Sequence, residues 1–315
     1  MRTLTESDVI AHFPALPEAV ELMRQGLQSI ADEQASVTPK SQVSLADDGF
    51  ANAMPASWPQ RNLLGLKWVA IAPGNAQRNL PTIDGIVVLN DGTTGETRAI
   101  MPAAWLTGIR TAAVTGASLE LDKRPVTFLG TGVQARSHAQ VLAALEYEEM
   151  RVWGRRPEAL AELAQWAAEH TPTLRLHTTT DRAEALAGAG VIISGLSFGA
   201  TEQRLELEDL ERFQIPTDAT FLPLDYGTVV GTSIAKEAAA SGGFAADDPE
   251  QFNTLRARKF PPGYPEATQA TGTLLRRGRS GGLTVVQNLG SGLADVILAD
   301  AIWQSASAAE GASQS

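Results

Sequence analysis

The sequence PVTFLGTGVQARSHAQVLAAL (residues 125–145) decides the fold of this chain. An apolar run at 126–129 leads into a glycine-rich turn, and a helical pattern of apolar residues follows it. This order of strand, tight turn and helix fits the G-x-G-x-x-A form of the dinucleotide-binding fingerprint. In that motif Gly130 allows the sharp turn, Gly132 lets the backbone approach a pyrophosphate, and Ala135 lets the helix pack closely. The free N–H groups and the positive dipole at the start of the helix then bind the phosphates.

An ordinary βα turn is the alternative, because three small residues recur by chance in a chain with 28 glycines. The sequence that follows favours the nucleotide site, since short apolar runs alternate with helical patterns. Strands are expected at 150–153, 174–178, 191–195, 220–224, 243–246 and 284–289, and helices at 158–169 and 183–187. Such alternation predicts a parallel, doubly wound sheet.

The chain before the glycine turn has a different pattern. Residues 5–34 predict two helices, the strands expected next are 37–45, 50–54, 64–71 and 86–89, and a helix follows at 102–121. A last helix at 292–306 is expected to pack on this region, and the tail at 305–315 is expected to fray. We therefore predict an α/β protein in which a Rossmann domain, residues 122–291, is inserted in an α+β domain, residues 1–121 and 292–315.

Composition excludes several classes of function. The net charge of −11 over 315 residues argues against nucleic acid or an anionic membrane as a partner, and Arg276, Arg277 and Arg279 are interpreted as solvated surface. Cysteine is absent and the four histidines are scattered, so no metal site is expected. The N-terminus does not resemble a signal peptide and no apolar run approaches the ~20 residues of a membrane span, so a cytoplasmic protein is expected.

The end of the second Rossmann strand bears on the choice of nicotinamide cofactor. An NAD-binding domain usually has an acidic residue there, which binds the ribose 2′-OH. This chain instead has Arg155 and Arg156 before Pro157. Two guanidinium groups suit a 2′-phosphate, so NADP is favoured over NAD, with solvated arginines ahead of a helix as the alternative.

Several motifs together resemble the ornithine cyclodeaminase/mu-crystallin family, over nearly the whole chain. They are Met54-Pro55, Leu66-Lys67 with Asn75 and Gly85, the helix segment LTGIRTAA at 106–113, the turn GTGVQA at 130–135, and Asn288-Leu289-Gly290 with Leu293-Ala-Asp295. The most specific piece is the R-T-A-A helix placed just before the G-x-G-x-Q-A turn.

This resemblance implies an N-terminal substrate and dimerisation domain, interrupted by the Rossmann domain and completed by the C-terminal helix. It assigns Lys67 and Arg110 to the substrate α-carboxylate, places Gly290 near the nicotinamide and the substrate, and puts Met54 in the substrate site. The cofactor residues that it implies are Thr111, Gly130, Gly132, Val133, Gln134 and Ala135. A homodimer is expected from the family's shared strand region.

Two positions depart from the family pattern. Ser41 stands where the family commonly has an arginine, and the adjacent Lys40 would point to the other face of a strand. The cyclodeaminases carry a catalytic aspartate after an N-A-V-G-type segment, and the nearest candidate here, Asp225, follows Phe-Leu-Pro-Leu. Both differences indicate a reductase or dehydrogenase rather than an ornithine cyclodeaminase.

The chemistry of imine reduction suits these residues. The substrate needs cations for its carboxylate, which Lys67 and Arg110 supply, and one carboxylate near its nitrogen, which Asp225 supplies. The competing interpretations are a structural salt bridge for Arg110, an outward strand position for Lys67, and a turn or N-cap for Asp225. Asn75 and Arg78 are further substrate candidates; Arg78 also fits a solvated loop, and if it faced the substrate it would favour a second carboxylate, as in iminosuccinate.

The resulting hypothesis is an NAD(P)H-dependent oxidoreductase that interconverts an α-imino or cyclic imino acid with its amino acid. Substrates of the iminosuccinate, pyrroline-carboxylate and alanine-dehydrogenase types all remain open. The alternatives are an amino-acid cyclodeaminase that uses bound NAD without net turnover and a non-catalytic binder of small ligands.

Overall fold

The computed structural model describes residues 1–196 and 201–314, and its chain divides into two compact units. The first unit is Met1–Arg110 with Gly290–Ser315, and the second is Thr111–Leu289. The sequence placed the boundaries at 122 and 292, whereas the first division falls inside helix α3 (Ala104–Ser118). The early turns of α3 go with the first unit because they contact its strands; the Thr107 hydroxyl, for example, lies 3.5 Å from Lys67 Nζ.

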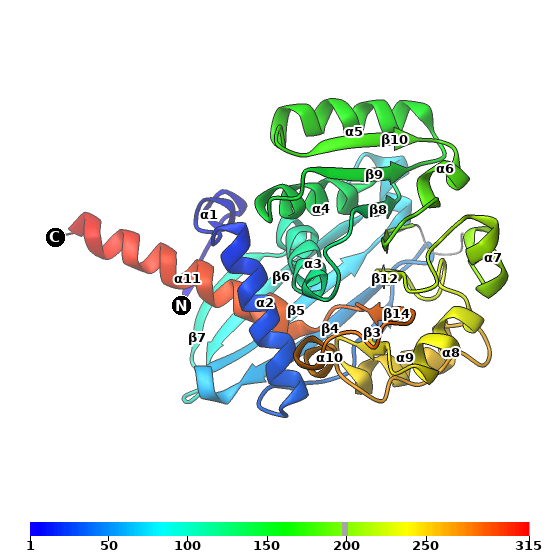
Figure 1. The fold of residues 1–315 in the computed structure, drawn as a ribbon. Helices are drawn as coiled ribbons and strands as arrows, with labels where there is room; N and C mark the ends of the chain where they lie inside the picture. The colour runs from blue at the N-terminus through cyan, green and yellow to red at the C-terminus, as the bar shows by residue number, and fades with distance from the viewer. Residues whose placement is uncertain (197–200, 315) are drawn as a thin grey trace. The chain divides into compact units, whose positions relative to one another are not determined.

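A mixed sheet forms the centre of the first unit (Figure 1). Its strands are β1 (Arg2–Thr3), β2 (Ser36–Val37), β3 (Ser41–Ser44), β4 (Phe50–Trp58), β5 (Leu63–Ile71), β6 (Ile83–Asp91) and β7 (Thr97–Pro102). Their order is β1-β7-β6-β5-β4-β2, with β3 also on β4, and only β1 and β7 pair in parallel. The strand expected at 37–45 is two short strands, and β1 and β7 were not anticipated.

Helices cover one face of this sheet. They are α1 (Glu6–Ala11), α2 (Leu16–Ala31) and α11 (Gly292–Gln314). A capping box formed by Thr5 and Asp8 begins α1. Helix α11 lies against β4, β5 and α2, as expected (Figure 1). Gly65 of β5 allows this close approach because it has no side chain: a Cβ at that position would stand only 2.8 Å from a methyl group of Val296 on α11.

The C-terminal tail corrects one expectation. It was predicted to fray after residue 305, but α11 continues to Gln314. Ala306 is fully buried, and Arg2 of β1 forms an ion pair with Glu310 in the last turns of the helix. These two contacts hold a segment whose small polar residues gave no sign of order.

The second unit has the predicted doubly wound sheet. The described strands run in parallel in the order β10-β9-β8-β11-β12-β14-β13. They are β8 (Val126–Leu129), β9 (Glu149–Trp153), β10 (Arg175–Thr179), β11 (Val191–Ser194), β12 (Thr220–Pro223), β13 (Phe244–Ala246) and β14 (Thr284–Gln287). The order reverses between β8 and β11, and ligands of such sheets bind at the carboxyl ends of the strands at that switch point.

Apolar side chains cover both faces of this sheet, because alternate residues of each strand point to opposite sides. Phe128 and Val152 belong to the cluster that includes residues of α4 (Val133–Ala144) and α5 (Pro157–His170), whereas Leu129 and Trp153 belong to the other cluster. That other face carries α6 (Arg182–Leu186), α7 (Leu207–Arg212), α8 (Thr232–Ala240) and α9 (Pro249–Lys259), and α10 (Thr271–Arg277) precedes β14. The sequence did not predict α7 to α10.

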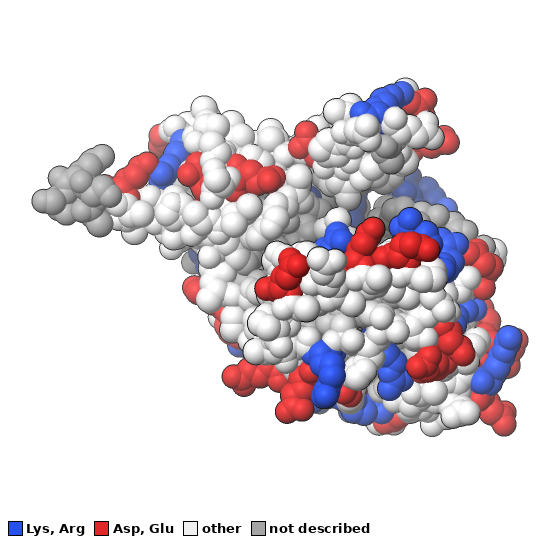
Figure 2. All heavy atoms as spheres, turned by 90° about the horizontal axis from the view of Figure 1, so that it is seen from above, with Lys and Arg blue, Asp and Glu red and all other residues white. Residues whose placement is uncertain are grey.

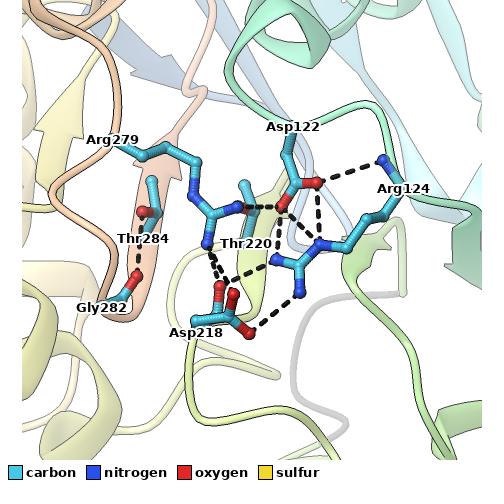
Figure 3. Close-up of polar contacts among 7 residues, drawn as sticks. All are labelled: Asp122, Arg124, Asp218, Thr220, Arg279, Gly282 and Thr284. Carbon is cyan, nitrogen blue, oxygen red and sulfur yellow. Dashed lines mark hydrogen bonds and ion pairs between the residues drawn. The ribbon is translucent and has the colours of Figure 1, made fainter.

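An ion-pair network joins the segments that enter β8, β12 and β14 (Figure 3). Arg124 lies between two carboxylates, with Nε 2.9 Å from Asp122 Oδ1 and Nη1 2.9 Å from Asp218 Oδ1. Arg279 donates to Asp122 Oδ2 at 2.7 Å, and the Thr220 hydroxyl donates to the same oxygen at 2.8 Å. The interpretation of Arg279 as solvated surface is therefore wrong: its side chain is only 16% exposed.

On the face drawn in Figure 2, basic (blue) and acidic (red) side chains are interspersed. The described residues on this face show no continuous basic area. None of the helices in the described part of the chain combines the length and the apolar character that crossing a bilayer requires.

Candidate active site

The glycine turn of the second unit has the geometry that a dinucleotide site needs. Gly130 has φ +130°, and a Cβ there would lie 2.9 Å from the carbonyl oxygen of Gly195. Only glycine tolerates both conditions. A Cβ on Gly132 would meet nothing within 4 Å, so the backbone at that position faces open space.

Beside the turn is a pocket of about 490 Å³. It is lined by Gly130, Thr131, Gly132, Trp153, Gly154, Arg155, Arg156, Gly195, Leu196 and Gln203. Gly132 is the N-cap of α4 and no side chain caps this helix, which leaves its first turn available to an anion. These residues fit a dinucleotide, with the pyrophosphate at the start of α4.

The other residues predicted to bind the cofactor occupy different environments. Ala135 is fully buried against the sheet, in agreement with the close packing that the motif requires. Val133 is 66% exposed. The Oε1 atom of Gln134 is buried with no hydrogen-bond partner among the described residues, and an unsatisfied acceptor of this kind suits a ligand. The Thr111 carbonyl accepts a hydrogen bond from the Thr115 hydroxyl within α3.

The two arginines considered for the 2′-phosphate follow β9. Both line the pocket beside the glycine turn. The Arg155 side chain is 64% exposed and stands 3.7 Å from Glu202, a weak surface pair. Arg156 is the exposed N-cap residue of α5. Their exposure allows either of them to turn toward a phosphate.

In the first unit, Lys67, Arg110 and Asp295 form a buried cluster of charges, which we call the carboxylate site. Lys67 is on the covered face of β5 and fully buried, so the alternative of an outward strand position is wrong. Its Nζ atom lies 2.8 and 2.9 Å from the two carboxylate oxygens of Asp295 on α11. The Nε atom of Arg110 on α3 lies 3.3 Å from Asp295 Oδ1.

The charges of this cluster do not cancel. When Lys67 is protonated, two cations share one carboxylate, which leaves one net positive charge in a buried place. Arg110 Nε lies 3.3 Å from Asp295 as an ion pair without a hydrogen bond, and none of the described residues makes a hydrogen bond to its two Nη atoms. These two Nη atoms form a fork that can bind a second carboxylate through two parallel hydrogen bonds.

The pKa of Lys67 reflects this excess of positive charge. Burial and the charge of Arg110 lower the pKa of Lys67 to about 7, and Lys40 has a smaller effect in the same direction. The Asp295 carboxylate raises the pKa of Lys67, both through its negative charge and through its hydrogen bond to Nζ. An added anion would raise the pKa of Lys67 again, so the site favours an anionic ligand.

Two further predicted residues lie at the carboxylate site. Gly290 has φ +79°, and a Cβ there would stand 2.5 Å from Arg110 Nη1. Met54 is buried on β4, directly opposite Lys67 in the β4–β5 register. The structure thus brings together residues 54, 67, 110 and 290, which are far apart in the sequence.

Asp225 of the second unit is almost completely buried, and its carboxylate already has partners. The Ser194 hydroxyl donates to Oδ2 at 2.6 Å, and the N–H groups of Thr228 and Val229 donate to Oδ1 at 2.8 and 3.3 Å. Burial raises the pKa of Asp225, although these donors favour the charged form. Its bonds to Thr228 and Val229 match the turn role that the sequence left open.

Asn75 and Arg78 belong to a 3-10 segment, Pro73–Arg78, between β5 and β6. The Asn75 side chain donates to the Pro81 carbonyl at 2.8 Å. Arg78 forms an ion pair with Asp47 at 2.7 Å, and both side chains are more than half exposed. The solvated-loop interpretation of Arg78 agrees with this contact.

The sequence reasoning missed Asp295 as a site residue. The sequence did contain a signal for it: an aspartate within the apolar pattern of residues 292–306 lies on or beside the buried face of the helix. A buried carboxylate there needs a cationic partner. The pattern did not show which cation would be the partner. Among the described residues no group of three or more acidic or histidine side chains could hold a metal ion.

Comparisons with known proteins extend these observations. A sequence model of the ornithine cyclodeaminase/mu-crystallin family matches residues 2–200. The chain is 36% identical over 167 residues to Delta(1)-pyrroline-2-carboxylate reductase 1 of Burkholderia multivorans, covering 51% of this chain and 53% of that protein. It is 38% identical over 156 residues to a Delta(1)-pyrroline-2-carboxylate/Delta(1)-piperideine-2-carboxylate reductase of Azospirillum brasilense, covering 47% and 49%. The chain therefore spans about half the length of the curated relatives it matches.

Solved structures show the same fold over almost the whole chain. Thermococcus litoralis Delta(1)-pyrroline-2-carboxylate reductase, in complex with NADH and L-proline, has a TM-score of 0.80 at 18% identity and covers 97% of both chains. An archaeal alanine dehydrogenase dimer with bound NAD has a TM-score of 0.82 at 20% identity, covering 98% of this chain and 97% of that one. With the family model matching well over half of its residues, the chain belongs to the ornithine cyclodeaminase/mu-crystallin family.

Proposed function

We propose that the protein is an NAD(P)H-dependent oxidoreductase that reduces an α-imino or cyclic imino acid to the corresponding amino acid. The observation that carries the proposal is the carboxylate site, in which Lys67 and Arg110 share the single carboxylate of Asp295. A buried pair of cations with one net positive charge and an unused guanidinium fork is costly unless it binds an anion. The α-carboxylate of an imino acid is such an anion.

The roles of the residues follow from this assignment. A reduced nicotinamide, bound at the glycine turn of the second unit, supplies the hydride. Lys67 and Arg110 bind the carboxylate and thereby fix the carbon of the C=N bond, so binding energy is converted into orientation. Met54 and Gly290 border the same carboxylate site. Asp225 follows β12 at the carboxyl ends of the strands, where ligands of such sheets bind, and is the proposed proton donor or orienting group for the imine nitrogen.

The substrate class can be narrowed. Arg78, the arginine that a second carboxylate would need, belongs to an exposed loop, and the carboxylate site has one net positive charge when Lys67 is protonated. This favours imines with one carboxylate, such as pyrroline-type rings or the imines of glyoxylate and pyruvate, over iminosuccinate. The relatives in Burkholderia multivorans and Azospirillum brasilense are reductases of pyrroline-type substrates, which supports the same choice.

For the cofactor, the structural neighbours were solved with NADH or NAD, and we propose NADPH as the preferred donor here. Arg155 and Arg156 line the pocket beside the glycine turn and are free to turn toward a 2′-phosphate. Replacing both by serine should raise the KM for NADPH at least tenfold and leave the KM for NADH within about twofold, since a charged hydrogen bond contributes roughly 1.5–3 kcal/mol. Equal effects on both cofactors would refute the NADPH preference.

The test of the reaction itself is a screen of cofactor oxidation with pyrroline-2-carboxylate, piperideine-2-carboxylate, iminosuccinate, and glyoxylate or pyruvate with ammonia. Lys67→Ala and Arg110→Ala should lose most of the rate, and Lys236→Ala, an exposed lysine of α8, is the matched control. A cyclodeaminase would release ammonia from a diamino acid with no net consumption of NAD(P)H. A non-catalytic binder would bind cofactor and turn over none of these imines.

A further inference from the structure

We propose that Asp295 is a positioning residue of the carboxylate site: it holds the Lys67 ammonium group beside the Arg110 guanidinium and cancels one of their two charges, so that the site accepts a ligand with one carboxylate. The role in catalysis rests on the proposed function, whereas the effect of Asp295 on Lys67 does not depend on it.

The geometry assigns this role to Asp295. The residue is fully buried in the first turn of α11, where the positive end of the helix dipole favours a charged carboxylate. Its two oxygens lie 2.8 and 2.9 Å from Lys67 Nζ, and Oδ1 also lies 3.3 Å from Arg110 Nε. One carboxylate thus connects a strand, β5, with two helices, α3 and α11.

Without Asp295 the two cations would repel each other. The groups that act on Lys67 are the Arg110 guanidinium, the Asp295 carboxylate, the Thr107 hydroxyl at 3.5 Å and Lys40, whose effect is the smallest on the pKa. Burial and the two cations all favour a neutral lysine, and Asp295 is the charged group that opposes them. An opposite charge at this distance typically moves a pKa by about 1–3 pH units.

Asp295 also decides which part of Arg110 is left for a ligand. Because Asp295 faces the Nε edge, the two Nη atoms point away from it, toward the space that a side chain at Gly290 would fill. A substrate carboxylate can then be bound by the Nη fork and by Lys67 together. With Lys67 protonated, the site has one net positive charge and one pair of Nη donors, which suits a ligand with one carboxylate.

The first experiment observes Lys67 directly and requires no turnover. The chain has only five lysines, so 13C-ε-lysine labelling gives a spectrum in which Lys67 is assigned from the loss of its signal in Lys67→Arg. The signal should titrate near pH 7 in the wild type and about 1–3 pH units lower in Asp295→Asn. Asp300→Asn is the matched control, since Asp300 lies on the same helix but pairs with Arg98 at 3.6 Å. An unchanged Lys67 titration in folded Asp295→Asn would overturn the proposal.

The second experiment measures binding of pyrrole-2-carboxylate, a planar monocarboxylate, to the protein with bound cofactor. Asp295→Asn should weaken binding about tenfold at pH 6, where Lys67 is mostly charged in the wild type and mostly neutral in the variant, and the KM for an active imine should rise by a similar factor while kcat changes far less. Asp295→Glu keeps the charge and should restore the Lys67 titration with only part of the affinity. If Asp295→Asn does not fold, Asp295→Glu decides: wild-type affinity and KM in that variant would overturn the proposal.

These outcomes separate the two proposals. A protein that reduces none of the imines, but in which Asp295→Asn lowers the titration of Lys67, would lose the proposed function and keep the positioning role. If the protein reduces an imine but Lys67 titrates identically in the wild type and in Asp295→Asn, the proposed function stands and the positioning role of Asp295 is refuted.

Discussion

At the residue scale, the charge of Lys67 is the feature on which ligand binding depends most directly. The pKa of this buried lysine is lowered to about 7 by burial and by Arg110. As the pH rises through 7, the free protein loses the proton, and the net positive charge of the carboxylate site disappears. We therefore expect the affinity for pyrrole-2-carboxylate, whose own carboxylate stays ionised, to fall up to tenfold for each pH unit above about 7.

The measurement is the dissociation constant by calorimetry between pH 6 and 9, in two buffers with different ionisation enthalpies. Above pH 7 binding should take up protons, because the ligand raises the pKa of Lys67. In Lys67→Arg the affinity should become independent of pH, since arginine stays charged. A flat profile in the wild type would show that Lys67 does not titrate in this range.

Gly290 is the second residue whose role can be tested alone. In Gly290→Ala the new Cβ would lie 2.5 Å from Arg110 Nη1, and the residue would be held at φ +79°. The backbone strain should lower the free energy of unfolding by about 1–3 kcal/mol, and displacement of Arg110 should raise the KM of the substrate at least tenfold. Urea denaturation and steady-state kinetics measure the two effects.

The control for Gly290→Ala is Gly95→Ala in the same unit. Gly95 has φ +76°, and a Cβ there would meet nothing within 4 Å. This variant should show the loss of stability without the change in KM. If both variants changed KM equally, the contact with Arg110 would not be the cause.

At the element scale, the sequence predicted what periodicity can reveal. The strands at 126–129, 150–153 and 191–195 and the helix at 292–306 are present, because each has a regular apolar pattern. Helices α7 to α10 were missed because they are short or lack a regular apolar stripe. Lys67 and Arg110 were found through family motifs, whereas the pairing of both with Asp295 depends on how α11 lies on β5, which the local sequence does not encode.

Arg279 shows the same limit. Three arginines within four residues read as a solvated surface, but Arg279 bridges Asp122 and Asp218 at the segments that enter β8 and β12 (Figure 3). Only the strand order, which places β12 next to β14, brings these segments together. We expect Arg279→Ala to lower the free energy of unfolding by about 2 kcal/mol, since it leaves buried carboxylate oxygens with fewer donors.

Chemical denaturation measures this effect, and Arg258→Ala on the exposed face of α9 is the control, with an expected change within about 0.5 kcal/mol. Cofactor affinity should not change in Arg279→Ala, because dinucleotides bind at the carboxyl ends of the strands and this network lies at their beginnings. A large loss of cofactor affinity with unchanged stability would contradict this assignment.

At the scale of the whole molecule, the face of the first sheet opposite its helices carries apolar side chains in the open. Trp68 and Ile86 are direct partners in the β5–β6 register and are 40% and 41% exposed, and Leu64 on the same face of β5 is 36% exposed. Large apolar side chains exposed together on one sheet face often mark a surface that another protein covers. We propose that a second copy of the chain covers it, as in a two-fold homodimer.

Trp68→Lys tests the homodimer, because Trp68 lies at the centre of this face, and a lysine on each copy would place like charges in an apolar contact. We expect the wild type to have the mass of a dimer by sedimentation at micromolar concentration and Trp68→Lys to dissociate, with its dissociation constant raised at least a hundredfold. Leu207→Lys, at a similarly exposed apolar position on α7 of the second unit, is the control and should stay dimeric. A monomeric wild type, or a Trp68→Lys variant with an unchanged dissociation constant, would show that the sheet face is not the interface. Because Lys67 points to the other side of β5, Trp68→Lys should still bind pyrrole-2-carboxylate if the first unit keeps its fold as a monomer.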